Sequence, residues 1–496
     1  MNRNHHKTIF FKHIIDRRTF LKTMGICAAG GLLSAVKCTA DSTKKPPLNF
    51  IIVLVDDLGW TDLSCYGSQY YETPNIDRLA SQGMQFSNAY AACAVCSPTR
   101  AAVLTGRYPA RVGVTDWIRA RFQREEEPTP EQKLPDYVGD SSQELLCPRN
   151  PFWMELNEIT LSEALKPAGY LSCHVGKWHL GMENWYPEKQ GFDFNIGGCD
   201  FGQPPSYFDP YYREKQGYIP TLKPRKEGEY LTDRENDEAV SFIRENRDRS
   251  FFLYMAHYAV HTPLQAKNDL IARYKAKKPT NHNNPVYAGM VHSVDEAVGR
   301  IMSTLDELNL TNNTVIIFTS DNGGLMSSTS NTPLRAGKGY PYEGGIRVPL
   351  IIRWHDVVEP SSVCDEPVTS IDYFPTIMEA AGVKIPSGHI IDGENLLPVL
   401  TQTGGLKRDA IYWHFPHYRQ RDIVPYSIIR AGDWKLIKRY EGKTFELFNL
   451  NDDLGEKNDL SKQMPAKVRE LDARLTTWLK ETDAKLPKKN PDYKPK

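Results

Sequence analysis

Residues 50–59, FIIVLVDDLG, contain the two features that decide the fold. The first six residues form a continuous apolar run rich in β-branched side chains, which is typical of a strand buried on both faces of a parallel sheet. Two carboxylates, Asp56 and Asp57, follow directly and lead to a glycine turn. We therefore expect an α/β fold in which a central strand ends in chemically active side chains.

The same pattern recurs far along the chain, in residues 314–324, TVIIFTSDNGG. Here a buried strand is expected to end in Asp321 and Asn322. A single pair of this kind is most simply explained as a turn, because Asp and Asn favour turns. Two pairs after two buried strands favour a metal site instead, and oxygen ligands suit Ca²⁺ or Mg²⁺ better than zinc or copper.

Two further strands are expected to deliver side chains to the same place. Residues 170–175 predict a strand that leads to Lys177 and His179, and residues 251–255 predict one that leads to His261. In an open α/β sheet, ligands bind outside the carboxyl ends of the strands. The lysine and the histidines add positive charge at that edge, which suits an anionic substrate.

A cysteine-containing motif lies in residues 93–107, CAVCSPTRAAVLTGR. Ser97 is predicted to cap a helix whose first residue is the proline that follows it. Cys96 would then lie just outside the helix N-terminus, where the helix dipole favours an anion. Arg100, in the first turn, is able to reach back toward Cys96. The alternative for Cys96 is a disulfide or redox pair with Cys93.

Together these motifs resemble the signature of the type I sulfatases, which belong to the alkaline-phosphatase-like superfamily, and the resemblance covers nearly all of residues 47–480. Residues 96–100, CSPTR, resemble the C-x-P-x-R signature, whose cysteine is oxidised to formylglycine in that family. Lys338, in the GKGY of residues 337–340, resembles a second sulfate-binding lysine. The resemblance implies metal ligation by Asp56, Asp57, Cys96, Asp321 and Asn322, substrate binding by Lys177, Lys338 and His261, and catalysis by Cys96, Arg100, His179, His261 and Asp321.

The resemblance also implies a mechanism. The aldehyde at position 96 is hydrated, one hydroxyl attacks sulfur, and the second later expels sulfate and restores the aldehyde. Asp321 accepts the proton of the attacking hydroxyl, His261 protonates the leaving oxygen and His179 assists the second step, while Arg100 holds the diol. The implied cofactors are Ca²⁺, with Mg²⁺ possible, and the formylglycine made by a formylglycine-generating or maturase enzyme.

The predicted function is hydrolysis of sulfate esters, with a sulfated carbohydrate or an aryl sulfate as substrate. Two alternatives remain at this point. One is a phosphate or phosphonate monoester hydrolase of the same superfamily, and the other is an inactive carbohydrate-binding relative.

The N-terminal residues 1–46 differ from the rest of the chain. Arg17-Arg18 precedes a short apolar run over residues 24–36, which resembles a twin-arginine export signal with cleavage near Ala40. The alternative is a segment that stays in the membrane as an anchor, for which the apolar run is short. We therefore expect an exported protein, periplasmic or extracellular, that meets the membrane only through this segment.

Composition sets the wider limits. The chain has 496 residues, with 61 Lys and Arg against 61 Asp and Glu, so its formal net charge is zero. That balance argues against a nucleic-acid-binding protein, which carries a basic footprint. The hydrophobic fraction of 40% is typical of a globular protein.

Two domains are expected after the export signal. Residues 47–400 are predicted to form the catalytic domain, an α/β domain with a large, mostly parallel mixed sheet between helices, and residues 401–485 a smaller C-terminal α+β subdomain. Its antiparallel strands are predicted at residues 410–414, 426–430, 434–438 and 445–448, followed by a helix over 465–480. The tail 486–496 is rich in Lys and Pro and is expected to fray.

Two long connections, residues 119–152 and 197–232, carry no clear periodicity. Loops of this length in a compact domain are often binding loops, and aromatic side chains in them are suited to stacking on sugar rings. For residues 119–152, a surface insertion without a ligand role is an equal alternative.

Overall fold

The computed structural model describes residues 47–123, 134–223, 227–419 and 422–495. The predicted export signal and its cleavage site lie outside the described residues. Residues 47–496 form one compact unit.

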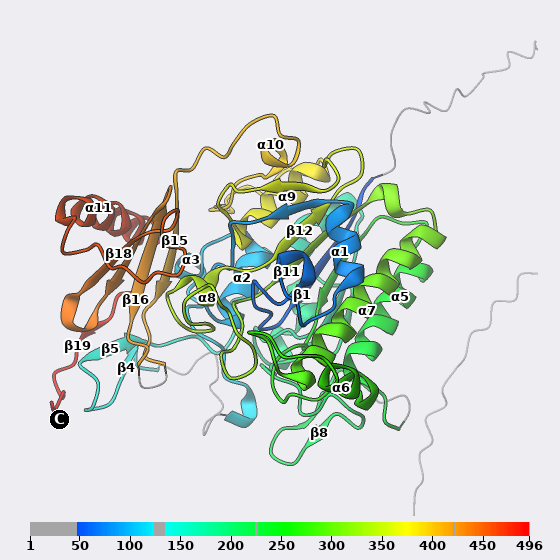
Figure 1. The fold of residues 1–496 in the computed structure, drawn as a ribbon, viewed down its shortest axis with the longest axis horizontal. Helices are drawn as coiled ribbons and strands as arrows, with labels where there is room; N and C mark the ends of the chain where they lie inside the picture. The colour runs from blue at the N-terminus through cyan, green and yellow to red at the C-terminus, as the bar shows by residue number, and fades with distance from the viewer. Residues whose placement is uncertain (1–46, 124–133, 224–226, 420–421, 496) are drawn as a thin grey trace, which may run out of the picture. The chain divides into compact units, whose positions relative to one another are not determined.

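An eight-stranded mixed sheet forms the centre of this unit (Figure 1). Its strands lie in the order β13 (Ser362–Cys364), β2 (Met84–Phe86), β12 (Leu350–Arg353), β11 (Thr314–Ser320), β1 (Asn49–Val55), β10 (Phe251–Ala256), β6 (Leu171–Gly176) and β7 (Phe194–Ile196). The five strands from β11 to β7 are parallel, whereas β12 runs antiparallel to both of its neighbours. The predicted α/β class with a mostly parallel mixed sheet is confirmed, and the four predicted core strands agree with β1, β6, β10 and β11 to within a residue or two.

Helices cover both faces of this sheet. Because side chains alternate along a strand, Ile51, Val53 and Val55 of β1 point to one face and Phe50, Ile52 and Leu54 to the other. The first face packs against α1 (Pro74–Ser81), α5 (Leu231–Glu245), α6 (Asn268–Lys275) and α7 (Pro285–Glu307), and the second against α2 (Cys96–Thr105), α4 (Leu161–Leu165) and α9 (Tyr373–Ala380). Burial of both faces explains why β1 is apolar along its whole length.

Smaller elements connect these layers. Helix α4 ends at Leu165 and continues as a 3₁₀ turn from Lys166 to Ala168. The remaining short elements are α3 (Pro109–Val112), α8 (Glu343–Ile346), α10 (Leu397–Leu400), β3 (Ala89–Tyr90), β14 (Val368–Thr369), β8 (Tyr212–Arg213) and β9 (Gly217–Tyr218).

The C-terminal part contains a separate antiparallel sheet. Its four strands are β15 (Ala410–Phe415), β16 (Tyr426–Ala431), β17 (Trp434–Arg439) and β18 (Phe445–Asn449), and α11 (Pro465–Glu481) packs against it (Figure 1). Lys435 of β17 reaches Glu343 of α8 at 2.9 Å and Glu456 at 2.7 Å, and all three side chains are buried. The predicted four strands and the helix are confirmed, and a buried ionic cluster links this sheet to the central part of the molecule.

The tail differs from the prediction. β19 (Lys488–Lys489) pairs with β5 (Leu145–Pro148), which also pairs with β4 (Tyr137–Val138). Asn490 adds hydrogen bonds to the carbonyl oxygens of Asp140 and Gln143, both at 2.9 Å. The expectation of a frayed tail is therefore wrong, because its pairing partner lies in a connection far away in the sequence.

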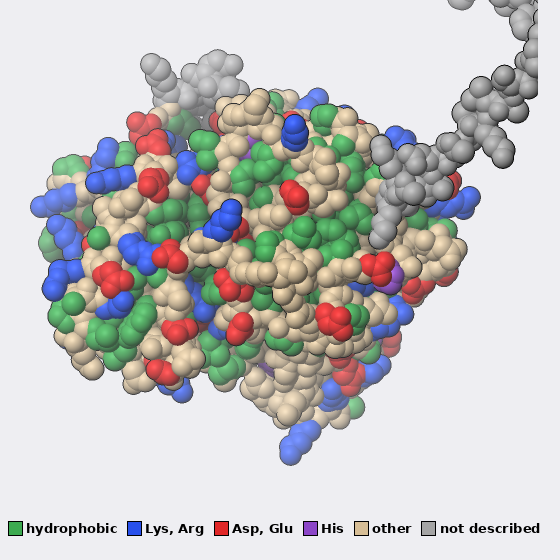
Figure 2. All heavy atoms as spheres, turned by 90° about the horizontal axis from the view of Figure 1, so that it is seen from above, with side chains coloured by type: hydrophobic (Ala, Val, Ile, Leu, Met, Phe, Trp, Pro, Cys, Tyr) green, Lys and Arg blue, Asp and Glu red, His purple; other side chains and the backbone are tan. Residues whose placement is uncertain are grey.

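The surface agrees with the balanced composition. Basic and acidic side chains are interspersed on the face in Figure 2, and no large area of one sign covers it. Among the described residues, no helix has the length and apolarity needed to cross a membrane.

Candidate active site

The two acidic pairs predicted from the sequence lie side by side at the carboxyl edge of the sheet. β1 and β11 are parallel neighbours, and Val55 lies opposite Ser320. Asp56 and Asp321, the residues that follow, therefore leave the sheet side by side. The amide nitrogen of Asp57 donates to Asp321 Oδ1 at 3.2 Å, and Asn322 Nδ2 donates to Asp57 Oδ1 at 2.8 Å. These side chains and that of Asp56 are fully buried or nearly so.

The segment after β6 brings a lysine to the same centre. Lys177 Nζ donates to Asp56 Oδ2 at 2.5 Å, and both side chains are inaccessible to solvent. The turn depends on Gly176, whose φ of +94° is costly for other residues and where a Cβ atom would lie 2.1 Å from the carbonyl oxygen of Ala256. His179 follows with a φ of 62°, an uncommon backbone conformation for a residue other than glycine.

Two further predicted residues approach Asp57 from separate loops. Lys338 Nζ lies 2.5 Å from Asp57 Oδ1, and His261 Nε2 lies 3.6 Å from Asp57 Oδ2. The other ring nitrogen of His261 lies 2.8 Å from the carbonyl oxygen of Thr262, which requires a proton on Nδ1. The loop of Lys338 is fixed to the cysteine motif, because the amide nitrogen of Gly339 donates to the carbonyl oxygen of Ala94 at 2.8 Å.

Cys96 is the first residue of α2, and Val95 is its N-cap. The expectation that Ser97 caps the helix and leaves Cys96 outside it is therefore wrong. Ser97 Oγ instead donates to the carbonyl oxygen of His179 and accepts from the amide of Ile118, both at 2.9 Å. Because this hydroxyl joins the chain segments of His179 and Ile118 to the start of α2, it fixes the position of His179 relative to Cys96.

His179 is the direct neighbour of the cysteine. Its Nδ1 atom lies 3.3 Å from Cys96 Sγ, and its Nε2 atom lies 2.7 Å from the carbonyl oxygen of Ile118. A carbonyl oxygen only accepts, so Nε2 carries the proton and Nδ1 is free to accept one from residue 96. The seven cysteines of the described residues are free, so no disulfide joins Cys93 to Cys96.

Arg100 connects the helix to the acidic centre. Its Nε atom donates to Asp321 Oδ2 at 2.9 Å, and NH1 donates to the carbonyl oxygen of Lys177 at 2.8 Å. The side chain is inaccessible to solvent, and charge-assisted hydrogen bonds of this kind are strong and directional. Arg100 therefore fixes Asp321 and the Lys177 segment against the start of α2.

The carboxylates of this centre carry unequal charge. Burial and the neighbouring Asp321 raise the pKa of Asp56 well above its usual value. Burial also acts on Asp57, but the ammonium groups of Lys338 and Lys177 outweigh it and hold the pKa of Asp57 below its usual range. The three buried carboxylates Asp56, Asp57 and Asp321 thus lie close together and are paired with Lys177, Lys338 and Arg100 respectively.

Both histidines are neutral in this environment. Burial and then Lys177 lower the pKa of His179 well below its usual value. Burial and then Lys338 lower the pKa of His261 to about 3. A neutral His179 is consistent with a proton-accepting Nδ1 atom beside residue 96.

The donor set fits a divalent cation with oxygen ligands. Asp56 Oδ1, Asp57 Oδ2 and Asn322 Oδ1 are buried and have no hydrogen-bond partner among the described residues. Ligand atoms of Asp56, Cys96 and Asp321 lie within 4.8 Å of one another. Buried polar atoms rarely remain unpaired, and hard oxygen ligands are those of Ca²⁺ and Mg²⁺.

All the predicted site residues thus meet in one buried centre, and beside it lie three residues that the sequence does not indicate, Asp116, Trp117 and Arg419. The Trp117 ring lies 6.4 Å from that of His179, and Arg419 NH1 lies 3.7 Å from Asp116 Oδ1. Residues 115–117 precede the connection 119–152, for which a binding loop and a surface insertion without a ligand role are equal expectations from the sequence. Nothing in the local pattern around Arg419 indicates a site, because this residue reaches the centre only through the tertiary fold.

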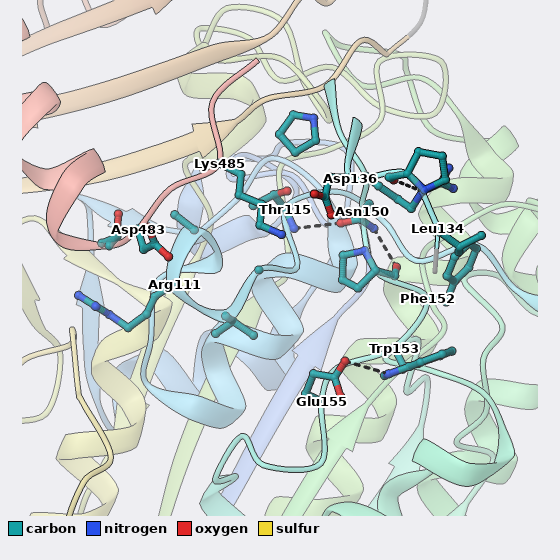
Figure 3. A pocket seen from close by; sticks show the side chains of 18 residues that line it. Arg111, Thr115, Leu134, Asp136, Asn150, Phe152, Trp153, Glu155, Asp483 and Lys485 are labelled. Carbon is teal, nitrogen blue, oxygen red and sulfur yellow. Dashed lines mark hydrogen bonds between the residues drawn. The ribbon is translucent and has the colours of Figure 1, made fainter. Parts of the chain in front are cut away.

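A separate cavity of about 400 Å³ lies between the segments of Thr115, Asn150 and Lys485 (Figure 3). It is lined by residues 148–153, among them Asn150 and Trp153, and by Lys485 near the C-terminus. None of the predicted catalytic or metal-binding residues lines it.

Comparison with known proteins gives matches over nearly the whole described chain. Residues 48–383 match the family model described as Sulfatase. Residues 337–485 match the model described as N-sulphoglucosamine sulphohydrolase, C-terminal.

Individual relatives agree with the family models. The chain is 34% identical to a sulfatase of Formosa agariphila, over 91% of this chain and 92% of that protein. It is 36% identical to human N-acetylgalactosamine-6-sulfatase, over 75% of this chain and 69% of that protein. Among solved structures, Ps i-CgsB in complex with k-i-k-neocarrahexaose superposes with a TM-score of 0.74 and 32% identity, covering 87% of this chain and 93% of that one.

Proposed function

The chain belongs to the sulfatase family of sulfuric ester hydrolases, and we propose that its substrate is the sulfate ester of a carbohydrate. The relatives support this choice, since one is named N-acetylgalactosamine-6-sulfatase and another is solved in complex with k-i-k-neocarrahexaose. The observation that carries the proposal is the burial of Cys96 beside His179, Asp56 and Asp321 in one centre with two lysines.

We further propose that Cys96 acts after oxidation to formylglycine. The position of Cys96 supports this proposal. Cys96 begins α2, its sulfur contacts the acceptor nitrogen of His179, and its ligand atom lies within 4.8 Å of those of Asp56 and Asp321. When present, the hydrated aldehyde supplies a nucleophilic oxygen and a second hydroxyl, which a thiol does not have. A dedicated maturation enzyme would have to produce it.

A divalent cation is the second proposed cofactor. Asp56, Asp57, Asp321 and Asn322 would hold it, together with residue 96, and Ca²⁺ is the first candidate with Mg²⁺ as the alternative. When bound, it supplies positive charge that lowers the pKa of a ligated oxygen and stabilises negative charge on sulfate. The unpartnered oxygens of Asp56, Asp57 and Asn322 support this assignment.

The proposed roles of the protein side chains follow from their contacts. Lys177 and Lys338 would bind and neutralise the sulfuryl oxygens, because both ammonium groups reach the acidic centre. Asp321, oriented by Arg100, is proposed to accept a proton from the nucleophile. His179 Nδ1 is proposed to accept the second proton at residue 96.

His261 is proposed to protonate the leaving oxygen. Its Nε2 atom faces the acidic centre beside Asp57, while Nδ1 is occupied by the carbonyl of Thr262. The negative charge of a bound sulfate opposes the effect of Lys338 on this imidazole, so substrate binding favours the protonated form.

The test is a comparison of sulfate and phosphate esters. Purified enzyme, with the oxidation state of Cys96 determined by mass spectrometry, is assayed with 4-nitrophenyl sulfate, 4-nitrophenyl phosphate and sulfated galactose and N-acetylgalactosamine. We expect sulfate release from the sugars and from the aryl sulfate. Faster turnover of the phosphate ester would favour a phosphate monoester hydrolase, and no turnover by oxidised protein would favour a carbohydrate-binding relative.

Export is also proposed, on the basis of Arg17-Arg18 and the apolar run that follows. The expected result is a mature N-terminus near residue 40 in protein recovered from the periplasm or medium. Recovery of the full-length chain from the cytoplasm alone would contradict it.

A further inference from the structure

A polar and aromatic segment, residues 115–119, lies directly against the catalytic centre. The amide of Ile118 donates to Ser97 Oγ at 2.9 Å, and its carbonyl oxygen is 2.7 Å from His179 Nε2. One residue earlier, the half-buried Trp117 ring lies 6.4 Å from the His179 ring. When the sulfate group of a substrate lies at residue 96, Trp117 is therefore within contact range of the ring that carries this sulfate.

Arg419 approaches the same place from the C-terminal part of the chain. Its backbone pairs with Ile423, and its side chain packs on Gly339, where a Cβ atom would lie 3.2 Å from Arg419 Cδ. Gly339 follows the sulfate-binding candidate Lys338 directly. Arg419 NH1 lies 3.7 Å from Asp116 Oδ1 and has no hydrogen-bond partner among the described residues. An arginine donor and a carboxylate acceptor are thus placed together beside the two catalytic segments.

The segment that carries Asp116 is held rigidly. Asn150 Oδ1 accepts from the amides of Thr115 and Asp116 at 3.0 and 2.9 Å, and Figure 3 shows Asn150 pointing at Thr115. Asn150 Nδ2 donates back to the carbonyl oxygen of Asp116 at 2.9 Å. Thr115 Oγ1 is 2.7 Å from His417 Nε2. Binding groups fixed before the ligand arrives lose less entropy on binding, which favours specific recognition.

On the basis of the proposed function, we propose that Asp116, Trp117 and Arg419 form a sugar-recognition site for the ring that carries the sulfate. Trp117 packs against the C–H face of the ring, Asp116 accepts a hydrogen bond from a ring hydroxyl, and Arg419 donates one to a hydroxyl oxygen. Arg119 lies over the Trp117 ring with its guanidinium carbon 5.3 Å from the ring centroid, in a cation–π contact with the indole.

The charge balance selects hydroxyl groups over a second anionic group. Arg419 is paired with Asp116, and the two side chains are only 21% and 14% exposed. A carboxylate or second sulfate on the sugar would meet the negative charge of Asp116 as well as the positive charge of Arg419. A hydroxyl group both donates and accepts, so it satisfies the two side chains together.

The experiment compares a sugar substrate with one that has no sugar. Arg419→Ala, Asp116→Asn and Trp117→Ala are assayed on 4-nitrophenyl sulfate and on monosulfated galactose and N-acetylgalactosamine. We expect Arg419→Ala and Asp116→Asn each to lose about 10- to 100-fold in kcat/KM for the sugar sulfate that the wild type prefers, since a hydrogen bond to a charged group has that value. Turnover of 4-nitrophenyl sulfate should be unchanged in Arg419→Ala and Asp116→Asn, because its ring has no hydroxyl group for these side chains, whereas Trp117→Ala should reduce turnover of both substrates, since either ring packs against the indole.

Two matched controls accompany these variants. Arg474→Ala removes a surface arginine paired with Asp409. Trp153→Ala removes a half-buried tryptophan that lines the separate cavity and stacks on Trp185. Neither should change the ratio of sugar to aryl sulfate turnover. An equal loss on both substrates in the Arg419 and Asp116 variants would indicate a structural role and overturn the proposal.

Deoxy sugars identify the contact itself. If Arg419 binds one hydroxyl, the sugar sulfate that lacks this hydroxyl is a poor substrate for the wild type, and Arg419→Ala reduces its turnover no further. Additive losses for every deoxy sugar would contradict direct recognition. Wild-type activity on 4-nitrophenyl sulfate but on no sugar would overturn the recognition site alone, whereas inactivity on all sulfate esters would contradict the proposed function.

Discussion

The Nδ1 atom of His179 lies 3.3 Å from the sulfur of Cys96, while its Nε2 atom is held by the carbonyl oxygen of Ile118 at 2.7 Å. This arrangement leaves an unprotonated nitrogen facing residue 96. Two chain segments fix it, because Ser97 Oγ binds both the His179 carbonyl oxygen and the Ile118 amide. The ring is therefore oriented as a proton acceptor before any substrate arrives.

Replacing this acceptor should slow turnover without preventing oxidation of Cys96. In His179→Gln we expect kcat for sulfate ester hydrolysis to fall about 10²- to 10⁴-fold, the usual contribution of a positioned acid–base group. The measurement is kcat normalised to the fraction of oxidised Cys96. His292→Gln, a change on α7 where the ring contacts Tyr274, is the control and should retain activity. Unchanged kcat in His179→Gln would exclude the proposed proton transfer.

Binding of a cation should be visible without any assay of activity. The unpartnered oxygens of Asp56, Asp57 and Asn322 predict that Ca²⁺ or Mg²⁺ raises the melting temperature of chelator-treated protein. At a free ion concentration of 100 times the Kd, the stabilisation is about 2.7 kcal/mol. Asp57→Asn should weaken the thermal shift. A melting temperature that is independent of both ions would contradict the metal assignment.

The turn after β6 should tolerate no side chain at Gly176. A Cβ atom there would lie 2.1 Å from the carbonyl oxygen of Ala256, in addition to the strain of a φ of +94°. Gly169 has a similar φ of +84°, but a Cβ atom there meets no described atom within 4 Å. Gly169→Ala should therefore cost only the conformational strain, about 1–2 kcal/mol.

Gly176→Ala should be clearly more destabilised than Gly169→Ala in thermal unfolding, and it should also lose activity because Lys177 and His179 follow directly. Equal melting temperatures for the two variants would show that the backbone at the end of β6 relaxes around the added methyl group.

The buried cluster of Lys435, Glu343 and Glu456 predicts a pH effect on stability. One lysine faces two carboxylates, and burial raises the pKa of Glu456 from 4.5 to about 7. A carboxyl whose pKa is raised on folding stabilises the folded state below about pH 4.5, and this contribution is lost as the pH rises to about 7. The full difference corresponds to about 3 kcal/mol.

Glu456→Gln removes this titration. Relative to the wild type, we expect its melting temperature to rise between pH 5 and pH 7.5, by up to about 3 °C for a chain of this size. Other groups that titrate in this range act on both proteins and cancel in the difference. Glu470→Gln, an exposed change beside Lys467, should follow the wild type at every pH. A constant offset between Glu456→Gln and the wild type would contradict the buried-charge explanation.

The catalytic centre could be predicted from the sequence because its residues follow strands. Parallel neighbours bring their carboxyl ends to one edge, and the pairing of Val55 with Ser320 places Asp57 beside Asp321. Cys96 and Lys338 were identified by family resemblance, and the structure brings them to the same centre.

Other features depend on contacts that no local pattern reveals. Ser97 has the side chain of a helix cap, but tertiary hydrogen bonds to His179 and Ile118 use its hydroxyl. Arg419 reaches the centre from a loop of the C-terminal sheet, where its backbone pairs with Ile423 and its side chain packs on Gly339. The tail was expected to fray because its partner strand β5 lies in an irregular connection.

The dependence of turnover on an oxidised Cys96 is tested most directly by measuring both quantities in the same samples. Preparations that differ in the extent of maturation are assayed on the preferred sulfate ester, and the peptide containing residues 93–100 is analysed by mass spectrometry, with Cys93 as the internal thiol control. Activity should rise in proportion to the fraction of aldehyde at position 96 and reach zero where that fraction is zero. Full turnover by protein in which Cys96 remains a thiol would contradict the proposed chemistry.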